Sequence, residues 1–354
     1  MKAFLASRKG IFVYKKAGTS WKLEKHHFDG VKASLVAWDP YSRKIWAGMA
    51  HGHWGPKLHV SKDKGRSFQE VPMPRMPGAK EGDKASNIAE VWGFAFDKTG
   101  RIYVGTAPAE LFHSDDGGQT WTHNTALHTM EGRDRWFAAA TESHCVHSIS
   151  VNPDNHDEIV VGISVGGVLI SKDRGKSWIY GNSGMKAYFM PDHNDPIVQD
   201  PHIVKRARSD SRILWQQNHC GIFKSEDGGA SWTDLSKAKG VKTPFGWGVV
   251  VDDNDANTAY TLPAQSDETR VPLQKKLIVQ KTTNGGKSWQ VLTNGLPQKN
   301  CFDIVYRHAF SGAGKSLLFG TTTGHVFFSH NQGKKWAQIK DYLPPIYGVK
   351  LVDL

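Results

Sequence analysis

Short apolar runs, each ending at a glycine, recur along the whole chain. Four clear examples have one polar or charged residue, three apolar residues and a glycine, and they occupy 44–48, 101–105, 158–162 and 316–320. Runs of this length bounded by turn residues are typical of short β-strands. No stretch keeps its apolar residues at the spacing of an amphipathic helix. The pattern therefore predicts an all-β protein built from many short strands.

An eight-residue motif follows these runs and repeats along the chain. Its form is Ser-x-Asp-x-Gly-x-Ser/Thr-aromatic, and it is clearest at 61–68, 114–121, 171–178 and 225–232. Copies with Asn in place of Asp occupy 282–289 and 329–336, and a decayed copy at 14–21 keeps only the second half. Successive copies begin 47 to 57 residues apart. Seven units therefore fill the chain, and the N-terminal residues complete the last one.

The residue types of this motif suit a tight turn between two strands. The Asp or Asn side chain accepts hydrogen bonds from backbone N–H groups of its own turn, and the Gly adopts a positive φ at little cost. The aromatic residue opens the next strand and packs between neighbouring sheets. Six of the 13 tryptophans are therefore predicted to be structural: Trp21, Trp121, Trp178, Trp232, Trp289 and Trp336.

The motif resembles the BNR or Asp-box repeat of the propellers found in sialidases, xyloglucanase-type hydrolases, sortilin-like receptors and photosystem II assembly factors. The resemblance covers nearly the whole chain. It implies one seven-bladed β-propeller domain over 1–354, with four-stranded blades and Asp-box turns. Ring closure would combine both chain ends, with 346–352 as the inner strand of a blade whose other strands come from the first 23 residues. The box occurs in enzymes and non-enzymes alike, so it implies little about function.

In propellers of this kind, ligands usually meet the channel face opposite the boxes. That face is built from loops that enter each inner strand and loops that join the second strand of a blade to the third. Inner strands are expected to begin near Lys32, Glu90, 142–144, 200–202, 245–247, 301–303 and Tyr347. Five histidines map to these loops: His51, His53, His144, His202 and His219. Such a residue alone is more often a polar loop residue than a ligand, so the prediction rests on the cluster.

Convergent imidazoles at one channel mouth suit a divalent transition metal, and Zn, Cu, Fe and Ni are all compatible. Three carboxylates map to the same face: Glu90, Glu142 and Asp200. Each could complete a ligand set, orient a histidine or act as a general base. In a hydrolytic mechanism the metal would lower the pKa of its water, and Glu142 or Glu90 would move the proton.

Four further residues of this face are candidate substrate contacts. Arg8 would attract a small polar or anionic substrate, and Trp54, Trp247 and Tyr347 could form a stacking wall. Core filling between blades explains Trp247 equally well. The leading hypothesis is a metal-dependent enzyme, with hydrolase or lyase chemistry ahead of oxidation. A non-catalytic assembly or interaction scaffold is the first alternative, and a metal-independent glycoside hydrolase that uses two carboxylates is the second.

Charge and cysteine content bear on the expected binding partners and cellular compartment. The 354 residues carry 45 Lys+Arg against 34 Asp+Glu, a formal net charge of +11. Many lysines lie in box turns away from the channel face, so a solvated basic surface explains them and argues against a nucleic-acid partner. Lys205, Arg206 and Arg208 form a dense basic segment, expected at the lower end of an inner strand. No apolar run suggests a membrane span, and three sparse cysteines indicate reduced thiols in a cytoplasmic protein.

Overall fold

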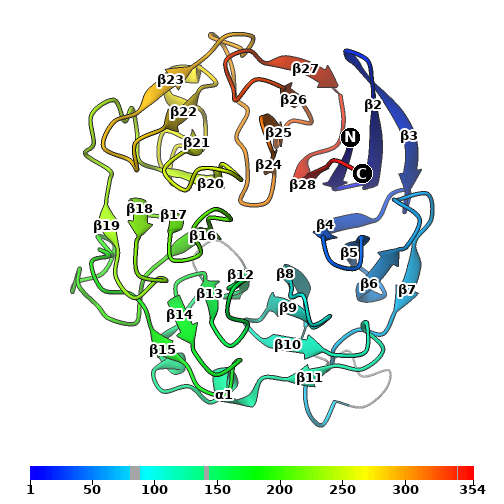
Figure 1. Cartoon of the computed structure of the whole chain (residues 1–354), viewed down its shortest axis with the longest axis vertical. Coiled ribbons are helices and arrows are strands. Elements are labelled where there is room, and N and C mark those ends of the chain that lie inside the picture. The colour runs from blue at the N-terminus through cyan, green and yellow to red at the C-terminus, as the bar shows by residue number, and fades with distance from the viewer. Residues whose placement is uncertain (80–87, 139–142, 341) are drawn as a thin grey trace.

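Seven four-stranded antiparallel sheets form a ring around a central channel in the computed structural model of the chain (Figure 1). The structure describes residues 1–79, 88–138, 143–340 and 342–354. This architecture confirms the predicted all-β, seven-bladed propeller. Within the described residues the helical elements are α1 (Thr125–His128) and two 3-10 turns, η1 (Arg133–Arg135) and η2 (Leu273–Lys275). None of these has the length and apolar character needed to cross a lipid bilayer.

The blades are numbered in chain order, and their strands are given from the channel outward. Blade 1 contains β28 (Ile346–Val352), β1 (Lys2–Ser7), β2 (Gly10–Ala17) and β3 (Ser20–His27). Blade 2 contains β4 (Lys32–Asp39), β5 (Lys44–His51), β6 (Gly55–Ser61) and β7 (Gln69–Val71). Blade 3 contains β8 (Glu90–Phe96), β9 (Ile102–Ala107), β10 (Leu111–Ser114) and β11 (Thr122–His123).

The remaining blades follow the same order. Blade 4 contains β12 (Val146–Val151), β13 (Ile159–Ile163), β14 (Gly167–Ser171) and β15 (Ile179–Tyr180). Blade 5 contains β16 (Pro201–Arg206), β17 (Leu214–Asn218), β18 (Gly221–Ser225) and β19 (Thr233–Asp234). Blade 6 contains β20 (Gly246–Val251), β21 (Ala259–Pro263), β22 (Val279–Thr282) and β23 (Gln290–Leu292). Blade 7 contains β24 (Phe310–Ala313), β25 (Ser316–Gly320), β26 (Val326–Ser329) and β27 (Ala337–Lys340).

The two chain ends close the ring within blade 1, as predicted. The C-terminal β28 pairs antiparallel with the N-terminal β1, from Lys2 opposite Val352 to Ser7 opposite Ile346. Leu5 and Leu351 are buried in a core that continues into blade 7. Figure 1 shows both termini beside each other in this blade. Closure leaves the ring without an open sheet edge at the junction, where another chain could otherwise add a strand.

The Asp-box turns have the hydrogen bonding that their residue types predict. Asp63 Oδ1 accepts from the backbone N–H of Ser67 at 2.9 Å, and Ser61 Oγ accepts from the N–H of Gly65 at 2.8 Å. Gly65 has a φ of +83°, and a Cβ there would lie 2.4 Å from the Phe4 ring of blade 1, so only glycine fits. The same contacts recur in the boxes of Asp116, Asp173, Asp227, Asn284 and Asn331. The boxes therefore set the spacing between blades.

Blade 7 departs from the expected inner strand. Its strand β24 begins at Phe310, whereas the sequence pattern placed the start near 301–303. Asp303 is buried and accepts hydrogen bonds from Thr321 Oγ1 at 2.9 Å and His325 Nδ1 at 3.0 Å. These contacts fix the segment to its own blade through side chains, so it does not join the strand ladder. Residues 306–308 consequently line the channel from a loop.

Candidate functional site

The channel face predicted to carry the site contains a cavity of about 740 Å³. Its lining combines aromatic residues with charged groups of both signs. The aromatic residues include Trp92, Phe245, Trp247, Tyr306 and Tyr347, and the charged ones include Lys32, Glu90, Asp200, Asp267, Arg270 and Arg307. A concave, partly apolar site with a few converging polar groups is the usual form of a small-molecule site.

Asp200 is the buried centre of this cavity. It precedes β16, and its Oδ1 accepts a hydrogen bond from the backbone N–H of Val165 at 3.1 Å. Val165 has a φ of 49°, a costly conformation for a β-branched residue and one that tends to mark functional sites. Burial raises the pKa of the Asp200 carboxyl, but interactions with His202 and Arg307 outweigh burial and hold the pKa below its usual range. Asp200 is therefore ionised at neutral pH.

His202 presents one unprotonated nitrogen to this carboxylate. Its Nδ1 lies 2.6 Å from the carbonyl oxygen of Gly246 in blade 6. A carbonyl only accepts, so Nδ1 must carry the proton. Burial lowers the pKa of His202, against the raising effects of Asp200 and of the Gly246 carbonyl. In the neutral ring with its proton on Nδ1, Nε2 carries a lone pair. That Nε2 lies 3.6 Å from Asp200 Oδ2, an arrangement that favours a cation between the two.

His219 approaches the same oxygen from the β17–β18 turn. Its backbone N–H donates to the carbonyl oxygen of Asp200 at 2.9 Å, so the β16–β17 pairing holds both residues together. The Nδ1 of His219 lies 3.6 Å from Asp200 Oδ2, and its Nε2 lies 3.3 Å from Asp267 Oδ2. If Nε2–H faces Asp267, the Nδ1 lone pair faces Asp200. A carboxylate behind a histidine is the common support of a metal-binding imidazole.

The spacing of these three groups fits a metal ion. Ligand atoms bound at 2.0–2.1 Å in a tetrahedral site lie roughly 3.3 Å from one another. His202 Nε2 and His219 Nδ1 each lie 3.6 Å from Asp200 Oδ2. This distance is longer than a hydrogen bond and close to the separation of two ligand atoms in a tetrahedral site. All three ligand atoms lie within 4.8 Å of one another. Two imidazoles and one carboxylate would leave further coordination positions open toward the cavity.

The structure places His51 and His53 outside this group, on the β5–β6 hairpin of blade 2. His51 Nδ1 accepts from the backbone N–H groups of His53 at 3.2 Å and Trp54 at 3.0 Å, so this ring caps its own turn. Trp54 is 71% exposed. Arg8 and His51 line a separate, shallower cavity of about 420 Å³, which shares Lys32 and Tyr347 with the larger one.

Three of the other predicted residues, Glu90, Trp247 and Tyr347, line the larger cavity. Glu90 pairs with Lys32 at 2.6 Å, and the Lys32 ammonium lies 5.1 Å from the Tyr347 ring centre. Trp247 stacks on His202, with ring centres 5.9 Å apart and an interplanar angle of 10°. His144 is not in the Asp200 group and instead lies against Trp136. Glu142 lies outside the described residues.

Sequence reasoning missed Asp267 and Arg307. Asp267 belongs to the connection over 264–278, which joins the second and third strands of blade 6 and was therefore available as a channel-face segment. Arg307 lies in the loop before β24, and its guanidinium stands 5.8 Å from the Trp92 ring centre. Arg270 similarly lies 5.9 Å from the ring of Trp247. Both guanidiniums line the larger cavity together with the carboxylates of Glu90, Asp200, Asp267 and Glu268.

The cysteines beside these histidines are poor ligand candidates. Burial raises the pKa of the Cys145 thiol to about 12 and that of Cys220 to about 11. Metal binding requires the thiolate, which these surroundings disfavour. The three cysteines are free thiols in the structure.

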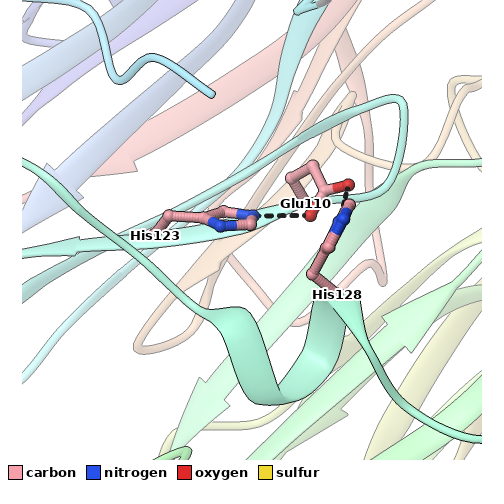
Figure 2. Close-up of side chains that lie close together, drawn as sticks. All are labelled: Glu110, His123 and His128. Carbon is pink, nitrogen blue, oxygen red and sulfur yellow. Dashed lines mark hydrogen bonds and ion pairs between the residues drawn. The ribbon is translucent and has the colours of Figure 1, made fainter. Parts of the chain in front are cut away.

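A second histidine group lies between blades 3 and 4 and has different geometry. Figure 2 shows His123 from β11 and His128 from α1 pointing at Glu110. Glu110 accepts from His123 Nε2 at 2.8 Å, His128 Nδ1 at 2.9 Å and Arg133 at 2.6 Å. These are hydrogen-bond lengths, shorter than a tetrahedral edge, and a guanidinium already neutralises the carboxylate. This geometry indicates a structural clamp that fixes α1 to the β9–β10 turn.

Ring, boxes and channel face together define a propeller of the BNR/Asp-box repeat type. A sequence model of the BNR/Asp-box repeat matches residues 112–123, which contain the box of blade 3. The oligoxyloglucan-reducing end-specific xyloglucanase of Emericella nidulans is 29% identical over 293 residues, which cover 81% of this chain and 31% of that protein. The chain thus spans less than a third of the length of this curated relative.

Solved structures show the same fold. The GH74 enzyme of Niastella koreensis superimposes with a TM-score of 0.57 at 14% identity, over 98% of this chain and 65% of that one. Ycf48 bound to a D1 peptide superimposes with a TM-score of 0.52 at 12% identity, over 87% of this chain and 82% of that one. At these identities the likeness concerns the fold alone.

Proposed function

We propose that this protein is a metal-dependent hydrolase that acts on a small polar or anionic substrate at the channel mouth. The proposed ligands are Asp200, His202 Nε2 and His219 Nδ1. One observation supports it above all: the His202 and His219 imidazole nitrogens each lie 3.6 Å from the buried Asp200 Oδ2. On the other side of its ring, His202 donates the Nδ1 proton to the carbonyl oxygen of Gly246. Lyase chemistry at the same site is the alternative outcome of a substrate screen.

The residues around these ligands have separate roles. A bound divalent ion would supply a water of lowered pKa. Asp267 would hold the Nε2 proton of His219 and so keep the Nδ1 lone pair directed inward. Arg270 and Arg307 would bind an anionic group of the substrate, while Trp247 and Tyr306 would contact its apolar part. Glu90, paired with Lys32, is the proposed general base.

Metal analysis of protein purified without a histidine tag tests the proposal. The expected result is about one zinc, iron, copper or nickel ion per chain, lost in His202→Ala and in Asp200→Asn. His51→Ala is the matched control, because that histidine faces the same side of the ring from another blade and should leave the metal content unchanged. Sub-stoichiometric metal in the native protein, or metal unaffected by His202→Ala, would overturn the proposal.

Activity assays provide a second test of the proposal. Native protein reconstituted with each ion should hydrolyse at least one member of a panel of small esters, lactones and phosphate esters, and a chelator should abolish this. If metal binds but Arg270→Ala and Arg307→Ala leave KM for anionic substrates unchanged, the substrate class is wrong. Tight capture of one protein partner by a protein that binds neither metal nor substrate would favour the scaffold alternative.

A metal-independent glycoside hydrolase is the second candidate, favoured by the sequence identity to the Emericella nidulans xyloglucanase. Asp200 and Asp267 would be its pair of carboxylates, with Trp247 as a sugar-stacking surface. Release of products from xyloglucan oligosaccharides in the presence of chelator, abolished by Asp267→Asn, would support this candidate. Chelator sensitivity separates the two.

A further inference from the structure

A second cavity, of about 350 Å³, occupies the other half of the central channel. The same inner strands line both cavities, and the second cavity is lined by residues further along each strand. In β20, for example, Trp247 lines the first cavity and Val249–Val251 line the second. His308 lines both cavities and lies between them. The channel therefore has two chambers, and the proposed function uses only one of them.

The second chamber is lined by two lysines from different blades, and the charge of one acts on the other. Lys205 comes from β16 in blade 5 and Lys350 from β28 in blade 1, which stand on different sides of the channel in Figure 1. Both side chains are half-buried. Among the described residues neither ammonium has a hydrogen-bond acceptor or a carboxylate within ion-pair distance, in contrast to Arg206, which pairs with Glu158 at 2.8 Å.

Charge in this chamber is not balanced. Arg208 and Asp253 pair at 3.5 Å at its edge, and Asp253 also attracts the Lys350 ammonium, so Lys205, Arg208 and Lys350 share this one lining carboxylate. Burial lowers the pKa of both lysines to about 8. At Lys350, repulsion from the positive charges of Lys205 and Arg208 adds to this lowering. Placing a charge in such a site without a partner costs free energy that a bound counter-ion would recover.

We propose that the second chamber binds a phosphate-class dianion between Lys205 and Lys350. The two lysines offer up to six N–H donors and two positive charges, which match the charge of one phosphate group. The chamber exceeds the size of a single phosphate, so either inorganic phosphate or the phosphate of a small ester fits. The site is distinct from the Asp200 group and does not rest on the metal proposal.

Calorimetric titration of the full chain with inorganic phosphate, at constant ionic strength and with chelator present, tests this site. Saturable one-to-one binding is expected, weakened about tenfold or more in Lys205→Met and in Lys350→Met. Lys176→Met, an exposed lysine of a box turn, is the control and should bind as the native protein does. His202→Ala should also retain binding, which separates this chamber from the first.

Parallel titrations with glycerol phosphate and with chloride define the ligand. Tighter binding of the ester identifies a phosphorylated small molecule, and equal or tighter binding of inorganic phosphate identifies the free ion. Chloride that competes as well as phosphate, or unchanged phosphate binding in the folded double variant Lys205→Met/Lys350→Met, would overturn the proposal. If the methionine variants do not fold, Lys205→Gln and Lys350→Gln keep a polar group and serve in their place.

Discussion

The Nδ1 of His202 in blade 5 lies 2.6 Å from the carbonyl oxygen of Gly246 in blade 6. This contact crosses a blade boundary, so the tautomer of the imidazole depends on how two neighbouring sheets pack. The first residue of β20 thereby directs the Nε2 lone pair of His202 toward Asp200. The orientation of this proposed metal ligand therefore depends on how the propeller blades pack, rather than on the segment that carries His202.

Asp267 should support metal binding through His219. Asp267→Ala removes the carboxylate 3.3 Å from His219 Nε2, which frees the ring to change tautomer and orientation. Loss of such a partner typically lowers metal affinity about tenfold to a hundredfold. Competition titration of zinc against a chromophoric chelator measures this. Glu268→Ala, the neighbouring carboxylate of the same cavity wall, is the control. Equal affinities in both variants would contradict the assigned role.

Glu110 should matter for stability and not for metal content. Glu110→Ala would leave Arg133 without its carboxylate in a partly buried site, at a cost of about 3–5 kcal/mol in the free energy of unfolding. Urea denaturation measures that loss, and Glu131→Ala, an exposed residue nearby, should change it little. A drop in bound metal in the folded Glu110→Ala protein would show that the second histidine group is a metal site after all.

Acid should weaken the Asp boxes. Hydrogen bonds from Ser177 and Ser171 lower the pKa of Asp173 to about 2 from its ordinary 3.8. A lowered folded-state pKa adds stability above pH 4 that disappears as pH falls toward 2. Asp173→Asn should therefore cost about 1 kcal/mol at pH 7, since the site is well solvated, and about half of that at pH 3.

The blade 6 box offers the reverse experiment. Asn284 Oδ1 already accepts from the backbone N–H of Ser288 at 3.0 Å, so an amide satisfies this turn. Asn284→Asp should introduce the acid dependence that Asp173→Asn removes, as read by urea midpoints between pH 7 and pH 3. Parallel pH profiles for both variants and the native protein would rule out this role for the box carboxylates.

Anion binding in the second chamber should fall as pH rises. The pKa of Lys205 and Lys350, lowered to about 8 by burial, means that both ammonium groups lose charge above that pH. Burial lowers the pKa of His308, which lies between the two chambers, to about 3, so this ring stays neutral. The other charged groups that line the chamber are Arg206, Arg208 and Asp253. Sulfate does not titrate between pH 7 and pH 10, so its affinity should decline through this range. Constant sulfate affinity would contradict a lysine-based site.

Blade closure should contribute strongly to stability. Leu351 on β28 is 2% exposed and packs in the core shared by blades 1 and 7. Leu351→Ala should lower the free energy of unfolding by about 2–5 kcal/mol through lost contacts and a cavity. Leu23→Ala is the matched control, because Leu23 lies in the same blade and is 51% exposed. Thermal and urea unfolding of both variants would reveal the difference, and similar losses would argue against closure as the main contribution.

Much of the site follows from the sequence, and the rest depends on packing between loops. Asp200, His202 and His219 can be placed on one face by strand order alone, and the β16–β17 ladder then brings them together. His51 and His53 satisfy the same positional rule, yet their hairpin uses its imidazole to cap itself. Strand order therefore predicts which residues lie on the channel face, but it does not predict where their side chains point.

The repeat by itself determined the fold, because each box encodes a turn and the period fixes how many sheets must close into a ring. It also determined which ends meet, since the N-terminal residues supply three strands of blade 1 and β28 at the other end supplies the fourth. The tertiary structure alone decided which histidines share a carboxylate and placed Asp267 and Arg307 beside them. The physical reason is that a turn is stabilised by residues a few positions apart, whereas the site depends on contacts between blades.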